Sequence, residues 1–191
     1  MKKITTLELV LCGLFTALTA VGAFIQIPVP GMDYFTLQFF FVLMAGMLLG
    51  SKLGAFSVGS YVLIGLVGVP IFAAGGGITY VLRPSFGYLL GFIVTAFVTG
   101  KLVEKLAFDG FKKYLVAAFA GLIVCYAIGL TYKYFMLNLY IGENTPVWLV
   151  LLDCFPLDLP GDIFLSVLAS VCGLRLKPEV NKIMDAHRAK R

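Results

Sequence analysis

Apolar residues recur in stretches of helix-spanning length along almost the whole chain, separated by short connections rich in glycine, proline or charge. Hydrophobic residues make up 60% of the 191 positions, and the mean hydropathy is +0.98. Charged residues make up 13%, whereas a soluble domain usually carries about 25%. A water-soluble fold of this size could not bury so much apolar surface, so the lipid bilayer is the expected solvent.

The apolar stretches predict an all-α integral membrane protein built as a bundle of six transmembrane helices. A spanning helix needs about 20 residues, so six of them use ~120 residues and leave room only for connections and tails. We therefore expect one membrane domain over residues 1–191, with its amino-terminal apolar stretch kept as the first span. The predicted spans are 7–25, 35–49, 53–67, 88–106, 115–137 and 159–176, followed by a basic tail at 177–191.

Two connections contain many helix-breaking residues and yet are too apolar for solvated loops. The first, 69–86, is expected to form a lid or re-entrant segment, because irregular backbone at membrane depth is tolerated only where protein buries it or where it lines a cavity. The second, 145–162, contains a short apolar helix at 147–152 and ends on Pro160, Gly161 and Asp162. Asp162 stands where a side chain would cap the N-terminus of the last span.

Lysine and arginine residues predict how the bundle is oriented. They gather at Lys2 and Lys3, at Lys52, at 101–113 and in the tail, whereas Arg83 and five acidic residues mark the other side. This asymmetry predicts an even number of spans with both termini in the cytoplasm. The tail carries apolar residues at helical spacing and is expected to lie on the inner membrane surface. Because the positive charges flank spans, they indicate topology and argue against nucleic-acid binding.

No catalytic motif is present in the sequence. The chain has no Walker A sequence, no H-E-x-x-H and no G-x-S-x-G, and its one histidine, His187, lies in the tail. We therefore expect a protein that is not an enzyme and carries no cofactor or metal. If the chain moves a solute actively, the energy must come from a partner.

Small residues recur at a spacing of four, which allows helices to approach closely. For most of these positions internal packing of the bundle is the favoured interpretation. Gly13 and Ala17 on the first helix are the best candidates for an outward face that contacts another membrane subunit. The packing positions are Gly46, Gly50, Gly54, Gly87 and Gly91.

A few polar residues near the presumed outer half are candidates for a binding site, because a charge at membrane depth is costly unless it is paired. Lys133, between two tyrosines in the fifth span, either lines a site or extends toward the outer interface. Asp162 is either a ligand-binding residue or a plain helix cap. Together with Arg83 and aromatic residues, these groups could enclose a small ligand that is partly polar and partly apolar.

Several segments in order resemble the BioY family over nearly the whole span 7–176. The motifs are FTLQ at 35–38, AGMLLG at 45–50, the segment 61–73, RPSFGYLLGF at 83–92 and LPGD at 159–162. The G-Y-L-x-G-F and P-G-D motifs, in this order and at this spacing, make the resemblance specific.

The resemblance implies the biotin-binding S component of an energy-coupling-factor transporter in the cell membrane of a prokaryote. It implies a six-helix bundle with a biotin pocket near the outer face, closed by the first connection and by the third-to-fourth connection. The implied partners are a transmembrane T component and two ATP-binding-cassette ATPase subunits. Gly13 and Ala17 match the small-residue motif of the family on the face toward the T component. The remaining alternatives are an S component for another vitamin and a membrane enzyme or assembly factor.

The resemblance also implies roles for individual residues. Asp162 is expected to accept hydrogen bonds from the ureido head of biotin. Many family members carry a lysine three residues after this aspartate, and Leu165 stands there instead. The hypothesis is that Lys133 or Arg83 supplies the missing positive charge. Gln38 is also expected to bind the ligand, and by its chemistry it can donate or accept a hydrogen bond with either end of its side-chain amide. The residues expected to cover the rings of the ligand are Tyr80, Tyr88 and Phe24.

Overall fold

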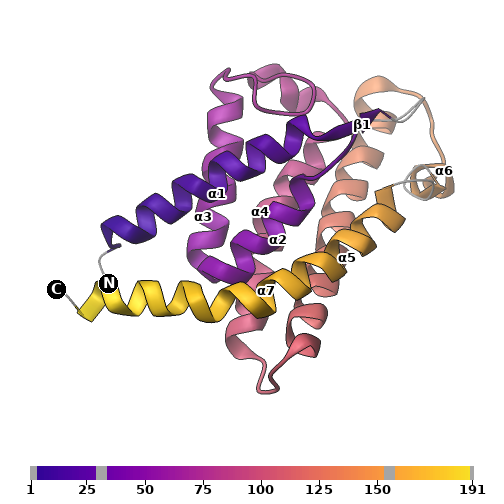
Figure 1. Ribbon diagram of the computed structural model, residues 1–191. Helices are drawn as coiled ribbons and strands as arrows, with labels where there is room; N and C mark the ends of the chain where they lie inside the picture. Colours follow the sequence, from indigo (N-terminus) through magenta and orange to yellow (C-terminus); the bar gives the residue numbers. More distant parts are fainter. Residues whose placement is uncertain (1–3, 29–33, 153–157, 190–191) are drawn as a thin grey trace.

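The structure is a computed structural model that describes residues 4–28, 34–152 and 158–189. Some of the charged residues that predict the orientation lie outside this part of the chain: Lys2, Lys3, Lys190 and Arg191, and two of the five acidic residues, Asp33 and Asp153. Within it, helices form a bundle, with a small hairpin of strands at one end (Figure 1).

In chain order, the elements are α1 (Thr6–Phe24), β1 (Gln26–Pro28), β2 (Tyr34–Thr36), α2 (Gln38–Leu49), α3 (Ser51–Leu66), the 3-10 helix η1 (Ile78–Leu82), α4 (Phe86–Lys105), α5 (Phe111–Phe135), the π-helical turn η2 (Met136–Ile141), α6 (Val147–Leu152) and α7 (Asp158–Ala189). Short elements follow α1, α3 and α5 at one end of the bundle, whereas α2 leads directly to α3 and α4 to α5.

Six of these helices correspond to the six predicted apolar segments. By length and composition, four helical stretches in the described part of the chain could cross a membrane: Thr6–Phe24, Phe86–Lys105, Phe111–Ile141 and Asp158–His187. The helices α2 and α3 have 12 and 16 residues, fewer than the ~20 that a membrane span needs. The first helix begins and the last helix ends on the same side of the bundle (Figure 1).

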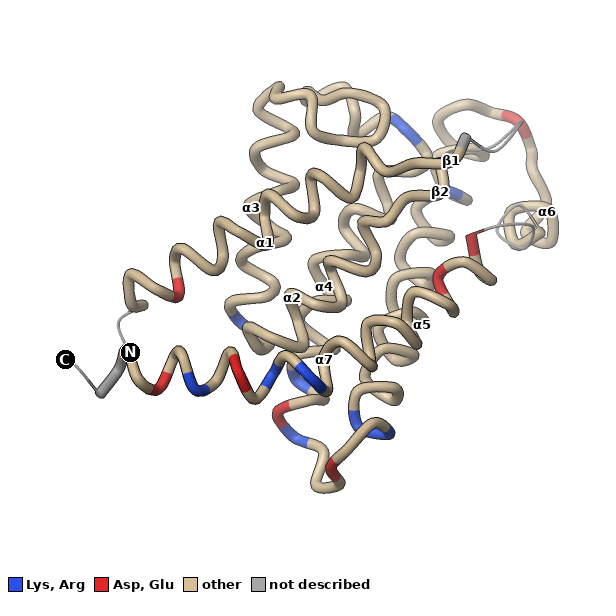
Figure 2. Tube along the Cα trace, in the orientation of Figure 1, with Lys and Arg blue, Asp and Glu red and all other residues tan. Residues whose placement is uncertain are grey.

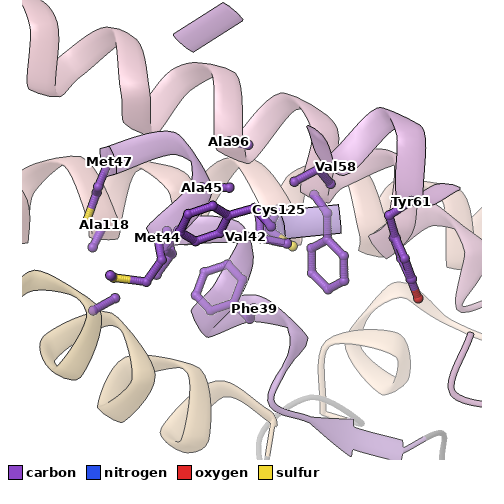
Figure 3. Packing of buried hydrophobic residues seen from close by; sticks show 14 of the residues in the cluster. Phe39, Val42, Met44, Ala45, Met47, Val58, Tyr61, Ala96, Ala118 and Cys125 are labelled. Carbon is purple, nitrogen blue, oxygen red and sulfur yellow. The ribbon is translucent and has the colours of Figure 1, made fainter. Parts of the chain in front are cut away.

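The short helix α2 lies at the centre of the bundle. It is apolar on all sides, which is the pattern of a helix surrounded by protein, and it packs against α1, α3, α4 and α7. Figure 3 shows its side chains between those of the neighbouring helices. The central cluster includes Phe39, Val42, Leu43 and Met47 of α2, Val58 of α3, Ala96 of α4 and Ala118 and Cys125 of α5.

Glycines bring the central helices into close contact, as the spacing of small residues predicts. A methyl group added at Gly46 would lie 2.5 Å from the carbonyl oxygen of Ala96, and one added at Gly91 would lie 3.0 Å from that of Cys125. Such close approach favours helix association in lipid, where dispersion contacts replace the hydrophobic effect. In contrast, no atom lies within 4 Å of a methyl group added at Gly13. The internal-packing prediction is confirmed for Gly46 and Gly91.

Strands β1 and β2 are a departure from the all-α prediction. They pair antiparallel, with Gln26 opposite Thr36 and Ile27 opposite Phe35. Each strand has three residues, too few for the alternating pattern that reveals a strand in a sequence. Because they join directly to apolar helices, 35–37 was wrongly assigned to the second span.

The last helix is longer than predicted. It continues without a break from Asp158 through Pro178 to Ala189, so the tail is not a separate segment. Near the middle of α7, Lys177 Nζ donates to the carbonyl oxygen of Leu48 at 2.9 Å. This contact joins α7 to the end of α2, and Val180, further along α7, packs against the core.

The positions of the charged residues along the chain distinguish the two ends of the molecule (Figure 2). We call the end with the α2–α3 and α4–α5 connections the basic end, because Lys52, Lys101, Lys105, Lys112 and Lys113 lie there. The opposite end carries β1, β2, η1 and the start of α7, and we call it the pocket end.

Candidate ligand pocket

A pocket opens at the pocket end between α2, α4, α5 and the start of α7. Two connections lie at this end: the first comprises the paired strands β1 and β2, and the second is the chain from Val67 to Ser85. Both connections contribute to the wall of the pocket. The residues lining it are Tyr34, Phe35, Thr36, Gln38, Phe39, Ala73, Tyr80, Ser85, Tyr88, Leu89, Phe92, Tyr126, Lys133, Asp158 and Asp162.

Asp162 is placed by α7 and faces α5. The Tyr126 hydroxyl donates to Asp162 Oδ2 at 2.9 Å. Because α7 begins at Asp158, Asp162 is one turn inside the helix and the predicted N-cap role is wrong. A carboxylate has room for about four hydrogen bonds, so Asp162 can accept from Tyr126 and still accept from a ligand.

Gln38 is placed by the first turn of α2. Its Nε2 donates to the Tyr61 hydroxyl at 2.6 Å, and its Oε1 accepts from Thr36 Oγ1 at 3.2 Å. The side chain is buried and bonded through both ends of its amide. These bonds hold the Gln38 side chain in one orientation at the pocket wall.

Aromatic rings form the rest of the wall. Tyr88 meets Tyr126 edge to face, with ring centroids 5.8 Å apart. Tyr80 packs against Phe72 at 4.6 Å, and the Arg83 guanidinium lies over the outer side of the Tyr80 ring, 5.4 Å from its centroid. Contacts of these kinds contribute about 0.5–1.5 kcal/mol each. The wall is therefore suited to a flat or apolar ligand group.

Ser85 presents an unpartnered polar atom at the pocket. Among the described residues, its Oγ is the one buried side-chain nitrogen or oxygen that lacks a hydrogen-bond partner. Leaving such a group unpaired costs about 1–3 kcal/mol. A ligand that accepts a hydrogen bond from Ser85 would recover this energy.

The pocket brings together charges of both signs. Asp158 and Asp162 supply carboxylates and Lys133 supplies an ammonium. The wall can accept hydrogen bonds, donate them and stack on rings, so it suits a small ligand with polar ends and an apolar middle. These features are typical of a site that binds a small molecule.

Five of the seven predicted ligand residues line the pocket: Gln38, Tyr80, Tyr88, Lys133 and Asp162. Lys133, for which extension toward the outer interface was the alternative, is among the lining residues.

The other two predicted residues lie elsewhere. Arg83 is outside the lining and contacts it through Tyr80. Phe24 is 60% exposed at the end of α1 and is not part of the lining. The reason is helical periodicity: Phe24 lies seven residues, or about two turns, after Ala17 and shares its outward face.

Tyr126 and Ser85 were missed by the sequence analysis. Tyr126 precedes Lys133 by seven residues in α5, so the two lie on one face of the helix. That spacing was a usable signal once Lys133 was a candidate. Ser85 follows Arg83 by two residues, but no sequence pattern distinguishes a buried unpartnered hydroxyl from one bonded to its own helix.

The fold and the site together define a helical membrane protein with a small-molecule pocket at one end of its bundle. The sequence model that describes the BioY family matches residues 1–182. The chain belongs to the BioY family.

Two relatives and one solved structure show the extent of the similarity. The chain is 43% identical over 176 residues to a probable biotin transporter BioY of Lysinibacillus sphaericus, covering 92% of this chain and 89% of the relative. It is 45% identical over 137 residues to the biotin transporter BioY of Thermotoga maritima, covering 71% and 77%. A crystal structure of the S-component for biotin from an ECF-type ABC transporter matches with a TM-score of 0.70 and 28% identity, covering 92% of this chain and 95% of that one.

Proposed function

We propose that this protein is the substrate-binding subunit of a biotin uptake system and works with an ATP-driven energy-coupling module. The observation that carries the proposal is the Asp162–Tyr126 pair at the wall of the pocket, in a chain of the BioY family. The relatives described above are biotin transporters, which are not enzymes. The protein accordingly binds its ligand unchanged.

The chemistry of biotin suits the pocket. Its ureido head offers N–H donors to Asp162, and hydrogen bonds to a charged group contribute about 1.5–3 kcal/mol each. Tyr80 and Tyr88 cover its apolar rings. Ser85 donates the hydrogen bond that its Oγ lacks in the ligand-free pocket.

The biotin carboxylate requires a positive partner, and the lysine found after the aspartate in many family members is absent here. Lys133 lines the pocket, so we assign it this role. Arg83 is exposed outside the lining, over Tyr80, and it attracts the anion to the rim. The bound carboxylate therefore depends more on Lys133 than on Arg83.

Binding is expected to widen the pocket. Its volume is about 90 Å³, whereas small-ligand sites usually have about 300–1,000 Å³. The first and second connections contribute to the wall beside the helices, so we expect the change in volume to occur there.

We propose that all six helices α1–α5 and α7 cross the cell membrane of a prokaryote, as one domain with both termini in the cytoplasm. The short α2 is compatible with this topology because protein, rather than lipid, surrounds it and its ends. The basic end then faces the cytoplasm, as the positive-inside rule requires.

The partners are a transmembrane T component and two ATP-binding-cassette ATPases. Support comes from α1, whose outward face is open at Gly13 and exposed at Ala17. Exposed apolar residues continue this face on both sides of the pair, so a second membrane helix can approach the α1 backbone closely. The exposed apolar residues of this face include Leu9, Val10, Leu14, Val21 and Phe24.

Binding of tritiated biotin to the purified protein tests the function. Saturable binding that other vitamins do not displace is expected. Displacement by another vitamin would reassign the substrate, and formation of a new product without partner subunits would indicate an enzyme. Lys133→Ala and Arg83→Ala separate the two cations: we expect a large loss of affinity for the first and a small loss for the second. Near-native affinity in both would contradict the carboxylate assignment.

A further inference from the structure

Tyr61 is a buried residue of α3 that does not line the pocket. Its side chain is fully buried, and its hydroxyl is bonded on both sides. It accepts from Gln38 Nε2 at 2.6 Å and donates to the carbonyl oxygen of Ile71 at 3.1 Å. In Figure 3, its hydroxyl points away from the apolar cluster. A buried tyrosine bonded in this way joins two parts of the chain that are far apart in the sequence.

The first of these parts is the β1–β2 connection. Thr36, the last residue of β2, donates to Gln38 Oε1 at 3.2 Å. The next residue, Leu37, donates its backbone N–H to the carbonyl oxygens of Gly22 and Ile25 at 3.1 Å each. The hairpin is therefore attached to Tyr61 through the Gln38 amide, and Thr36 itself lines the pocket.

The second part is the connection between α3 and α4. Its residue Ile71 accepts from Tyr61, and the neighbouring Phe72 packs edge to face on the Tyr61 ring at 5.5 Å. Phe72 in turn packs on Tyr80, a pocket residue. Because a methyl group at Gly65 would lie 2.2 Å from the Phe72 ring, this ring has no freedom to shift toward α3.

Three hydrogen bonds thus form one chain, from Thr36 through Gln38 and Tyr61 to Ile71. We propose that Tyr61 is a positioning residue that couples the two connections at the pocket, so that biotin leaves only when both connections open. The release step rests on the proposed function, whereas the coupling itself is a property of the ligand-free protein.

Tyr61→Phe tests the proposal, since it keeps the ring packing and removes only the hydroxyl. We expect biotin to dissociate on the order of 10-fold faster, because the Gln38 amide and the Ile71 carbonyl lose their shared partner. Tyr114→Phe is the matched control: Tyr114 is also buried, at the basic end, and its change should leave dissociation within about twofold of the unmodified protein. An unchanged dissociation rate in Tyr61→Phe would overturn the proposal.

Hydrogen exchange in the ligand-free protein measures the coupling directly. The amides to follow are Leu37 in the first connection and Phe72 and Gly77 in the second, which are bonded to Gly22, Gly75 and Gly65. Thr36→Val perturbs only the first connection. As the only substitution, it is expected to speed hydrogen exchange at Phe72 and Gly77 about threefold. In a protein that also carries Tyr61→Phe, it is expected to have no such effect.

The outcomes separate the coupling from the proposed function. The coupling is wrong if Thr36→Val speeds exchange at Phe72 and Gly77 equally with and without Tyr61→Phe. It is also wrong if Thr36→Val speeds exchange only in the first connection. The effect of Thr36→Val in the otherwise unmodified protein decides this even if Tyr61→Phe does not fold. If no vitamin binds while the exchange results hold, the proposed function fails and the coupling stands.

Discussion

The two ends of the bundle place similar polar residues in different surroundings. At the basic end, Glu104 accepts from the backbone N–H of Ser51 at 2.8 Å and from its hydroxyl at 3.0 and 3.1 Å, while Lys177 bonds the carbonyl oxygen of Leu48. A carboxylate thus meets the N-terminus of α3 and an ammonium meets the C-terminus of α2, each where the helix dipole favours it. At the pocket end, Asp162 accepts from the hydroxyl of Tyr126 on another helix, and both side chains line the pocket.

The difference teaches how to distinguish structural charges from functional ones in this protein. At the basic end, the contacts of Glu104 and Lys177 serve free backbone groups at helix ends. At the pocket end, polar groups face a shared space, and Ser85 Oγ has no partner among the described residues. Substitutions at the basic end should therefore change stability, and those at the pocket end should change ligand affinity.

The largest effect is expected for Asp162→Asn. The amide oxygen can still accept from Tyr126, but the charge that attracts the ureido N–H groups is lost. We expect biotin affinity to fall about 100-fold, with the free energy of unfolding changed by less than about 0.5 kcal/mol. Isothermal titration and thermal unfolding in detergent measure the two quantities.

Asp185→Asn, on the exposed part of α7, is the control for the loss of one negative charge. It should leave biotin affinity unchanged. A loss of less than about threefold in Asp162→Asn would show that Asp162 does not contact the ligand.

A smaller effect is expected for Glu104→Ala, and it is expected on stability instead of ligand affinity. Removing the cap leaves the first N–H groups of α3 without their acceptor, which should lower the free energy of unfolding by about 1–2 kcal/mol. Biotin affinity should stay within about twofold, because Glu104 lies at the other end of the bundle. Glu179→Ala, at an exposed pair with Lys182, is the control. A tenfold loss of affinity in Glu104→Ala would mean that the two ends do not act separately.

The smallest effect is expected for Ser85→Ala. The ligand loses one neutral hydrogen bond, worth about 1 kcal/mol, so affinity should fall about fivefold. Stability of the ligand-free protein should be unchanged or slightly higher, because a buried unpartnered hydroxyl is removed. Ser60→Ala, whose hydroxyl bonds Phe56 within α3, should leave affinity as it is. If Ser85→Ala lowered stability and left affinity unchanged, Ser85 would contribute to packing of the protein and not to ligand binding.

The helical part of the fold could be predicted because apolar length is a local property. Every predicted span overlaps a helix, and the ends agree within a few residues for α1, α3 and α4. The hairpin and the length of α7 could not be predicted. The strands depend on pairing between segments, and the part of α7 beyond residue 176 contacts segments far away in the sequence through Lys177 and Val180.

Only part of the candidate site could be predicted. Asp162 and Lys133 stood out because a charge in an apolar segment is rare in a sequence. Tyr126 did not stand out, since tyrosines are common in this chain. Phe24 was predicted to cover the rings of the ligand, but helical periodicity puts it on the outward face with Ala17.

The sequence by itself determined that the chain is a bundle of apolar helices and which of its ends is basic. It also determined which few charged residues lie within apolar segments and are therefore candidates for a site. Each of these follows from composition and spacing along one segment. Only the tertiary structure decided that Asp162 bonds Tyr126, that Ser85 is unpartnered and that Tyr61 joins the two connections. These are relations between side chains far apart in the chain, and their geometry depends on how the helices pack.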